Sequence, residues 1–263
     1  MTATPGATSA WTGWTDQANA MLSFDDEALV LTTLPHGENG AVVRFLSLTG
    51  GLRAGYVPGA RGKAKRALIH PGNRVALHLS ARAEGQLPGA TLELLESRAL
   101  LAFEPRAAAM LAWLAELTAT ATAEAVPHPR LAAALDALLT GLGAGMDATA
   151  AQAALARYEL LLLAEEGFGL DLTACALGGP ASDLAFVSPR SGRAVSREKS
   201  SGQPWEAQLL PLPRFLLDGG PATPADVAQA LTLSAHFLRA HWLNNDLREA
   251  TRNRAIGSAR PTP

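Results

Sequence analysis

The sequence contains one cysteine and few aromatic residues, and each scarcity excludes a class of structure. With Cys175 as its single thiol among 263 residues, the chain can form no internal disulfide and no multi-thiolate metal cage. Aromatic residues make up 5% of the chain, whereas alanine and leucine are abundant, which favours helices over an all-β protein. Such cysteine usage is typical of a reducing compartment, so we expect a cytoplasmic protein.

The sequence also lacks long apolar runs and a strong net charge. No apolar stretch approaches the roughly 18 residues that cross a bilayer, so we expect no membrane contact. The first twenty residues lack the basic start and apolar centre of a secretory signal, and we predict that residues 1–23 form a disordered extension. The formal charge of -2 argues neither for nor against nucleic acid.

Catalytic motifs are missing as well. The sequence has no G-x-S-x-G, no G-x-x-x-x-G-K-[ST] and no H-E-x-x-H. His236 and His241 are five residues apart, which places them on different faces of a helix. We interpret Cys175 as a buried structural thiol and expect Glu165 and Glu166 to face water. The sequence therefore predicts no enzyme, no metal site and no cofactor.

Between residues 28 and 101 the sequence reads as short strands separated by turn residues. We expect strands at 28–34, 41–48, 52–57, 74–79 and 91–100, with a turn at 35–40 and a basic, glycine-containing loop at 59–67. Short strands joined by connections of very unequal length fit a small closed barrel better than an open sheet. We predict an OB-fold over residues 24–103.

Beyond Pro105 apolar residues recur at the spacing of helices. We expect helices after 105, over about 130–142, from Asp147 or Thr149 to near 167, and from Thr223 to about 243 or beyond. The fold class is therefore α+β: an N-terminal OB-fold barrel followed by a mainly α-helical domain at 104–252. Its Pro- and Gly-rich segment at 170–222 is expected to be an irregular ordered loop, and residues 253–263 a flexible tail.

Six basic side chains and no acidic one lie between residues 53 and 74. They are Arg53, Arg61, Lys63, Lys65, Arg66 and Arg74. On a small barrel such residues bind phosphate backbones without reading sequence. A solvated loop with no particular role is the alternative interpretation. A second basic group contains Arg239 and Arg248, which either contact a partner or form an ordinary charged helix end.

Residues 28–63 resemble the opening barrel of the RecO family of recombination mediators. The resemblance depends on the order of a Pro-x-Gly-Glu turn, a Thr-x-Gly turn and a Gly-Ala-Arg segment, carried here by Pro35, Gly37, Glu38, Thr49, Gly51, Gly59, Ala60 and Arg61. Weaker similarity continues through 113–117, 124–131, 157–179, 186–198 and 209–216. One departure is clear, because some relatives have two Cys-x-x-Cys pairs for zinc and this chain has only Cys175. Apolar packing must therefore hold this region.

The resemblance implies a DNA repair and recombination function without bond chemistry. It implies binding to single- and double-stranded DNA, annealing of complementary strands, and loading of the recombinase onto strands covered by single-strand-binding protein (SSB) in the RecF pathway. The implied partners are RecR and the acidic C-terminal tail of SSB. Two alternatives remain: a helical interaction scaffold whose barrel does not bind nucleic acid, and a hydrolase with an unrecognised site.

Overall fold

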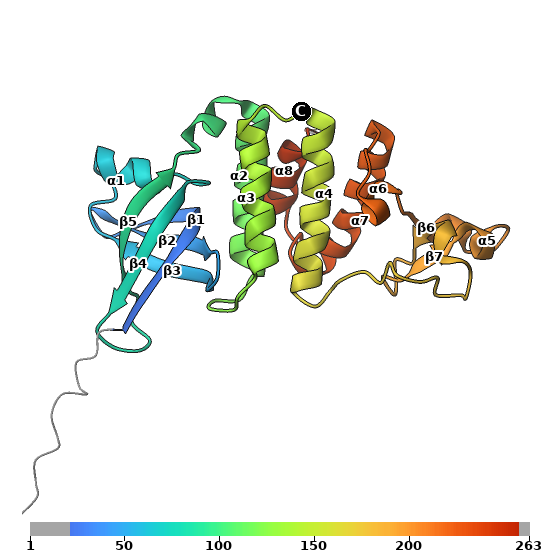
Figure 1. The fold of residues 1–263 in the computed structure, drawn as a ribbon, viewed down its shortest axis with the longest axis horizontal. Helices are drawn as coiled ribbons and strands as arrows, with labels where there is room; N and C mark the ends of the chain where they lie inside the picture. Colours follow the sequence, from blue (N-terminus) through green and yellow to red (C-terminus); the bar gives the residue numbers. More distant parts are fainter. Residues whose placement is uncertain (1–21, 258–263) are drawn as a thin grey trace, which may run out of the picture.

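The computed structural model describes residues 22–257, in which a small barrel, a helical bundle and a short distal sheet follow one another along the long axis (Figure 1). Most of the expected N-terminal extension, residues 1–21, and the end of the expected tail, residues 258–263, lie outside the described residues. None of the helices within 22–257 combines the length and apolarity needed to cross a membrane.

The barrel has five strands in the order β1-β2-β3-β5-β4, with β4 pairing back to β1. The strands are β1 (Leu22–His36), β2 (Gly40–Ser47), β3 (Gly51–Val57), β4 (Arg74–Ala81) and β5 (Gly89–Glu96). Between β3 and β5 the ladder has one parallel pair, Tyr56 with Gly89. The α+β class with an OB-like N-terminal barrel is therefore confirmed.

Strand β1 is much longer than the sequence indicated. Its first half pairs with β4 and its second half with β2, with a register shift between Val30 and Thr32. Leu22 and Ser23 belong to this strand, so these two residues are not part of the extension that was expected to reach residue 23. Three consecutive acids at 25–27 concealed the strand, because they resemble a polar leader. Asp26 instead accepts a hydrogen bond from the backbone N–H of Thr49, 2.8 Å away, in the β2–β3 turn.

The basic segment 59–67, predicted as a loop, is a tight turn followed by the helix α1 (Lys63–Leu68). The Gly62 N–H donates to the Gly59 carbonyl at 2.9 Å, and Gly59 has a φ of 67°, where glycine is favoured. Lysine, alanine, arginine and leucine are good helix formers. Six residues are too few to show an apolar period, which explains the incorrect prediction.

The helical bundle follows a 3₁₀ turn, η1 (Ala99–Phe103). Its helices are α2 (Pro105–Ala121), α3 (Pro129–Gly143), α4 (Ala148–Glu165), α7 (Pro224–His241) and α8 (Asp246–Ala255). Of the two caps considered for α4, Asp147 and Thr149, the structure has Asp147. The cap predicted at Thr223 is confirmed, and Thr223 forms a reciprocal capping box with Asp226. Helix α8 continues past residue 252, where the tail was expected to start.

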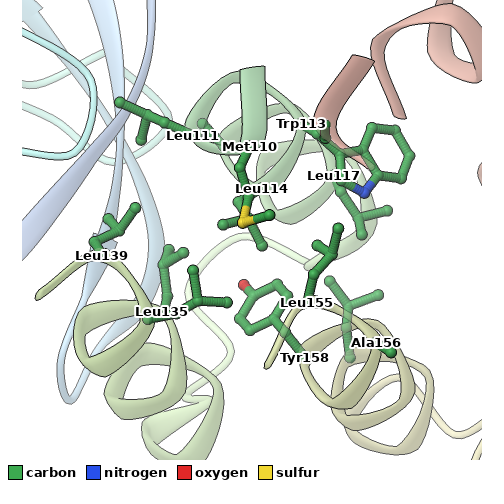
Figure 2. Packing of buried hydrophobic residues seen from close by; sticks show 14 of the residues in the cluster. Met110, Leu111, Trp113, Leu114, Leu117, Leu135, Leu139, Leu155, Ala156 and Tyr158 are labelled. Carbon is green, nitrogen blue, oxygen red and sulfur yellow. The ribbon is translucent and has the colours of Figure 1, made fainter. Parts of the chain in front are cut away.

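The core of the bundle lies where α2, α3 and α4 meet (Figure 2). Tyr158 of α4 points between the other two helices, and its hydroxyl lies 2.6 Å from that of Thr118. Met110 and Leu114 of α2 surround the ring together with Leu135 of α3. A buried tyrosine with a satisfied hydroxyl adds apolar area without leaving an unpaired polar atom.

The barrel and the bundle share one apolar core. Four leucines of the barrel strands pack in the same cluster as the bundle helices: Leu29, Leu31, Leu46 and Leu52. The α2–α3 connection also lies along β3, where the Ala125 N–H donates to the Leu52 carbonyl at 2.9 Å. A Cβ added at Gly51 would collide with the Val126 backbone. The bundle therefore covers part of the barrel face formed by β1, β2 and β3.

The segment expected to be irregular contains a small antiparallel sheet in the order β7-β6-β8. Its elements are η2 (Ala181–Asp183), β6 (Leu184–Val187), β7 (Ala194–Ser196), α5 (Arg197–Ser200), η3 (Glu206–Gln208), β8 (Leu210–Pro211) and α6 (Phe215–Asp218). Trp205, Leu209 and Leu210 pack within its own apolar cluster, as predicted, but Phe215 packs in the bundle core. Strands of two to four residues are too short for an alternating pattern to be recognised.

Cys175 belongs to the apolar cluster of this distal sheet, together with Leu184 and Val187. Its Sγ accepts hydrogen bonds from the backbone N–H groups of Ser196, at 3.2 Å, and Leu177, at 3.4 Å. Burial by itself raises the pKa of Cys175. The hydrogen bonds from Ser196, Leu177 and Gly179 outweigh that effect and lower the pKa to about 7.

We expect the Cys175 thiol to stabilise the fold increasingly as the pH rises from about 7 to about 9. The folded-state pKa is about 7, below the value near 8.5 of an unfolded chain, so the unfolded state binds more protons in this interval and unfolding becomes less favourable. Ultraviolet absorbance of the thiolate during a pH titration gives the folded pKa. Denaturant unfolding of the unmodified protein and of the Cys175→Ser variant across the same pH range isolates the contribution of the thiol to the free energy of unfolding. If the unfolding free energies of the two proteins changed in parallel with pH, the prediction would be wrong.

Candidate nucleic-acid interface

Four of the six predicted basic residues gather at α1 and the turn before it, at the end of the molecule farthest from β6 and β7 (Figure 1). Arg61 is in the turn, and Lys63, Lys65 and Arg66 are in α1; Lys65 is partly exposed and the other three are exposed. We call these four residues the α1 cluster. Helix α1 buries none of its own residues, so its cationic side chains face solvent.

Asn73, fully buried, fixes the position of α1. Its Nδ2 donates to the carbonyls of Ala67, at 2.8 Å, and Leu68, at 3.1 Å, at the end of the helix. Its Oδ1 accepts from the Arg98 N–H at 2.9 Å, and its carbonyl accepts from Val30 at 2.9 Å. A buried amide with these partners connects α1 to the barrel. Sequence reasoning missed Asn73, because a single asparagine between glycine and arginine reads as a turn residue.

The α1 cluster has no acidic partner in the described part of the chain. No carboxylate of residues 22–257 lies within 4.0 Å of a nitrogen of its four side chains. By contrast, most of the arginines that do form ion pairs within residues 22–257 connect one structural element to another. Four unpaired cations on a short exposed segment form a local positive potential that attracts polyanions.

Arg53 is at the opposite end of β3 from the α1 cluster. Arg53 lies four positions before Val57 along the strand, or roughly 13 Å at about 3.3 Å per residue. Its guanidinium lies over the Phe24 ring, 4.2 Å from the ring centre, in a hollow that also contains Glu84 and Glu124. The structure therefore does not bring Arg53 together with the other predicted residues.

Arg74 is engaged in ion pairs between the barrel and α3. Its Nη2 lies 2.5 Å from Glu27, and its Nη1 lies 3.5 Å from Asp136. The hydrogen bond with Glu27 raises the pKa of Arg74. Buried Arg98 contacts the same Asp136 at 2.6 Å. Because these contacts engage its guanidinium, Arg74 does not belong to the α1 cluster of unpaired cations.

The two arginines considered for partner binding belong to different helices, Arg239 to α7 and Arg248 to α8. Arg239 at the end of α7 pairs with Glu249 at 3.0 Å, whereas Arg248 lies 3.4 Å from Glu116 of α2 and donates to the Trp242 carbonyl. Arg239 borders a hollow of about 360 Å³ between α7 and α8. Its apolar lining includes Val227, Leu231, Ala235 and Ile256.

The acidic residues at the end of α4 were expected to face water, but they contact a buried histidine. Glu165 and Glu166 each lie 3.4 Å from a ring nitrogen of His128, which is 6% exposed. Burial raises the pKa of Glu166, while the nearby His128 opposes that shift. Within residues 22–257 no group of three or more His, Cys, Asp or Glu side chains converges as metal ligands.

Comparison with known proteins gives a consistent result for both halves of the chain. The model for "Recombination protein O N terminal" matches residues 21–98, and that for "Recombination protein O C terminal" matches residues 102–249. The protein of Rhodospirillum rubrum named DNA repair protein RecO is 44% identical over 229 residues, which cover 85% of this chain and 90% of that protein. The protein of the same name from Caulobacter vibrioides (strain CB 15) is 42% identical over 82% of this chain and 86% of its own length. That from Paracoccus denitrificans is 41% identical over 83% of this chain and 87% of its own length.

These matches define the class as DNA repair proteins with an OB-like barrel and a helical C-terminal part. The chain belongs to the RecO family.

Proposed function

We propose that this protein binds single- and double-stranded DNA through the α1 cluster, anneals complementary strands, and helps load the recombinase onto SSB-coated single strands in the RecF pathway. The observation that supports this proposal is that none of the four neighbouring cations has an acidic partner within residues 22–257. Each side chain can therefore neutralise a phosphate without first breaking an ion pair. No bond is made or broken in this activity, which takes place in the bacterial cytoplasm, at the nucleoid.

Annealing makes modest physical demands on the protein. Two strands repel each other through their phosphates, and cations that bind the backbone reduce this repulsion while the base edges stay free to pair. The α1 cluster is suited to backbone contact because its long side chains extend from an exposed helix. Arg53, at the other end of β3, offers a separate contact for a longer or second strand.

A binding titration over a salt series tests this function. We expect fluorescence anisotropy with a labelled single-stranded oligonucleotide to give a linear fall of log K with log salt. The slope should be about -3 if four phosphates are contacted at roughly 0.7 each. An annealing assay with and without SSB then measures the mediator activity. Absence of binding in dilute buffer would refute the proposal.

For the SSB tail we propose the hollow between α7 and α8. An acidic peptide that ends in apolar residues needs an apolar pocket beside a cation. The lining by Val227, Leu231 and Ile256, with Arg239 at the edge, provides both. Arg239 would have to exchange Glu249 for a carboxylate of the tail. RecR is proposed as a second partner, with no surface assigned to it.

A second candidate function is that of a protein-interaction scaffold, and one observation favours it. Leu100 and Phe103 of η1 are 80% and 83% exposed. Neighbouring exposed side chains of this size are typical of protein-binding surfaces. A scaffold with no DNA-binding role would show neither oligonucleotide binding at low salt nor a salt slope, so the same titration separates the two functions.

A further inference from the structure

A hollow of about 510 Å³ lies beside the α1 cluster. Its walls come from the ends of β1 and β2, the turn before α1, and the connection from α1 to β4. The lining residues are Thr33, Pro35, Gly40, Ala41, Ala60, Arg61, Arg66, Ile69, His70 and Pro71. This volume is in the range of small-molecule sites.

The interior of this hollow is apolar and its border is cationic. Ala41, Ala60 and Ile69 are each no more than 5% exposed and form apolar walls. Arg61 and Arg66, both exposed and both members of the α1 cluster, contribute the charge. Two polar groups are also present: the Thr33 hydroxyl, which donates to the Ile69 carbonyl at 3.1 Å, and the ring of His70.

Three further hollows in the described part of the chain differ in charge from this one. The one at Arg53 contains Glu84 and Glu124, and the one beside β6 contains Asp183 and Asp226. In the hollow between α7 and α8, Arg239 and Arg252 are both paired with glutamates. The α1 hollow therefore combines apolar walls with unpaired cations, which suits a ligand that has a flat apolar part next to negative charge.

An unstacked nucleotide has this combination of properties. Its base is flat and apolar on both faces, with polar groups at its edge, and a phosphate lies on either side along the strand. Lys63 and Lys65 of α1 add two further cations outside the lining of the hollow. This additional charge favours a polymer with repeated charges over a ligand with one terminal carboxylate. In duplex DNA the bases are stacked and paired, so a base can enter only after an energetic cost.

We propose that the hollow beside α1 receives one unstacked base of a single DNA strand while Arg61 and Arg66 bind the adjacent phosphates. This inference rests on the proposed DNA binding and extends it, because it predicts a preference for single-stranded over double-stranded DNA. Thr33 and His70 would contact the edge of the base. The site would hold a strand in place while leaving its other bases free to pair.

The first test changes the DNA and leaves the protein intact. Anisotropy titrations compare an oligothymidylate with an oligonucleotide of equal length and charge in which every position is abasic. We expect the abasic strand to bind about 10-fold more weakly or worse, in line with the contribution of a single stacked base. Equal affinities would overturn the proposal while leaving phosphate binding, and so the proposed function, intact.

The second test fills the hollow. Ala60→Leu places three additional carbons in it without changing charge, and Ala64→Leu makes the same change at an exposed position of α1 outside the lining. We expect Ala60→Leu, and not Ala64→Leu, to lower affinity for oligothymidylate by about 10-fold, with a smaller effect on a duplex. Equal effects of the two substitutions would contradict a base site.

Two further outcomes are distinguishable. If neither strand type binds at low salt, the proposed function itself fails. The hollow could instead bind an acidic peptide with an aromatic C-terminal residue. In that case the peptide would bind the unmodified protein and not the Ala60→Leu variant, and abasic and normal strands would bind equally. That combination of results would show that the nucleotide proposal is wrong. Should Ala60→Leu fail to fold, the comparison of abasic and normal strands still decides the question.

Discussion

Replacing Arg252 with alanine is expected to destabilise the protein by about 3–5 kcal/mol, because it leaves a carboxylate buried without its counter-ion. Arg252 of α8 is 4% exposed and Glu159 of α4 is fully buried. The guanidinium donates to both carboxylate oxygens at 2.8 Å, and a further hydrogen bond reaches the Leu231 carbonyl of α7 at 2.9 Å. Trp113 of α2 donates to the same glutamate at 2.8 Å. One ion pair therefore connects four helices.

Thermal and denaturant unfolding measure this effect. A loss of this size lowers Tm by roughly 10 °C or more in a protein of this length. Arg254→Ala, two residues further along α8 at an exposed position, is the matched control and should change stability by less than about 0.5 kcal/mol. The double variant Glu159→Gln/Arg252→Met removes both charges, so we expect it to be more stable than Arg252→Ala. Equal stability of Arg252→Ala and the unmodified protein would show that the pair is not formed.

Changing Lys63, Lys65 and Arg66 together to alanine is expected to weaken binding to single-stranded DNA by about 100-fold at roughly 0.1 M salt. Each lost phosphate contact removes about 0.7 from the slope of log K against log salt, so the slope should become shallower by about 2. Alanine is the best helix former, and α1 buries none of its residues, so the fold should persist. Anisotropy over a salt series gives both quantities, and annealing rates should fall in parallel.

A control with the same loss of charge uses the distal sheet. Arg190, Arg197 and Lys199 are exposed on that part of the protein, far from α1. Their joint replacement with alanine changes the net charge equally, and we expect it to leave affinity and slope unchanged. If both triple variants lost affinity to the same degree, binding would depend on overall charge and the α1 cluster would not be the interface.

The sequence predicted the fold class and most element positions because its signals were local. The caps at Asp147 and Thr223 and the proline at the start of α7 define helix ends through contacts within one turn. Similarly, a turn at 37–39, within the predicted turn segment 35–40, separates β1 from β2. Helix α1 and the distal sheet were missed because segments of two to six residues carry no readable period.

The basic residues of the candidate site were visible in the sequence, but their arrangement was not. Arg53, Arg74 and the α1 cluster are close in sequence, yet a strand separates Arg53 from α1, and ion pairs with Glu27 and Asp136 engage Arg74. These partners come from positions 47 residues before and 62 residues after Arg74. The hollow beside α1 likewise combines β1, β2 and the α1–β4 connection. Such long-range pairings depend on tertiary structure.

The leucines that β1, β2 and β3 contribute to the bundle have a consequence for dissecting this protein. A fragment of the protein that ends after β5 would lack the bundle helices. It would therefore expose to solvent the four leucines that pack against those helices, Leu29, Leu31, Leu46 and Leu52. Such a fragment would tend to self-associate, and oligonucleotide retention by its aggregates would be a misleading measure of affinity. Deletion mapping is therefore the wrong approach here, and point substitutions in the intact chain are the right one.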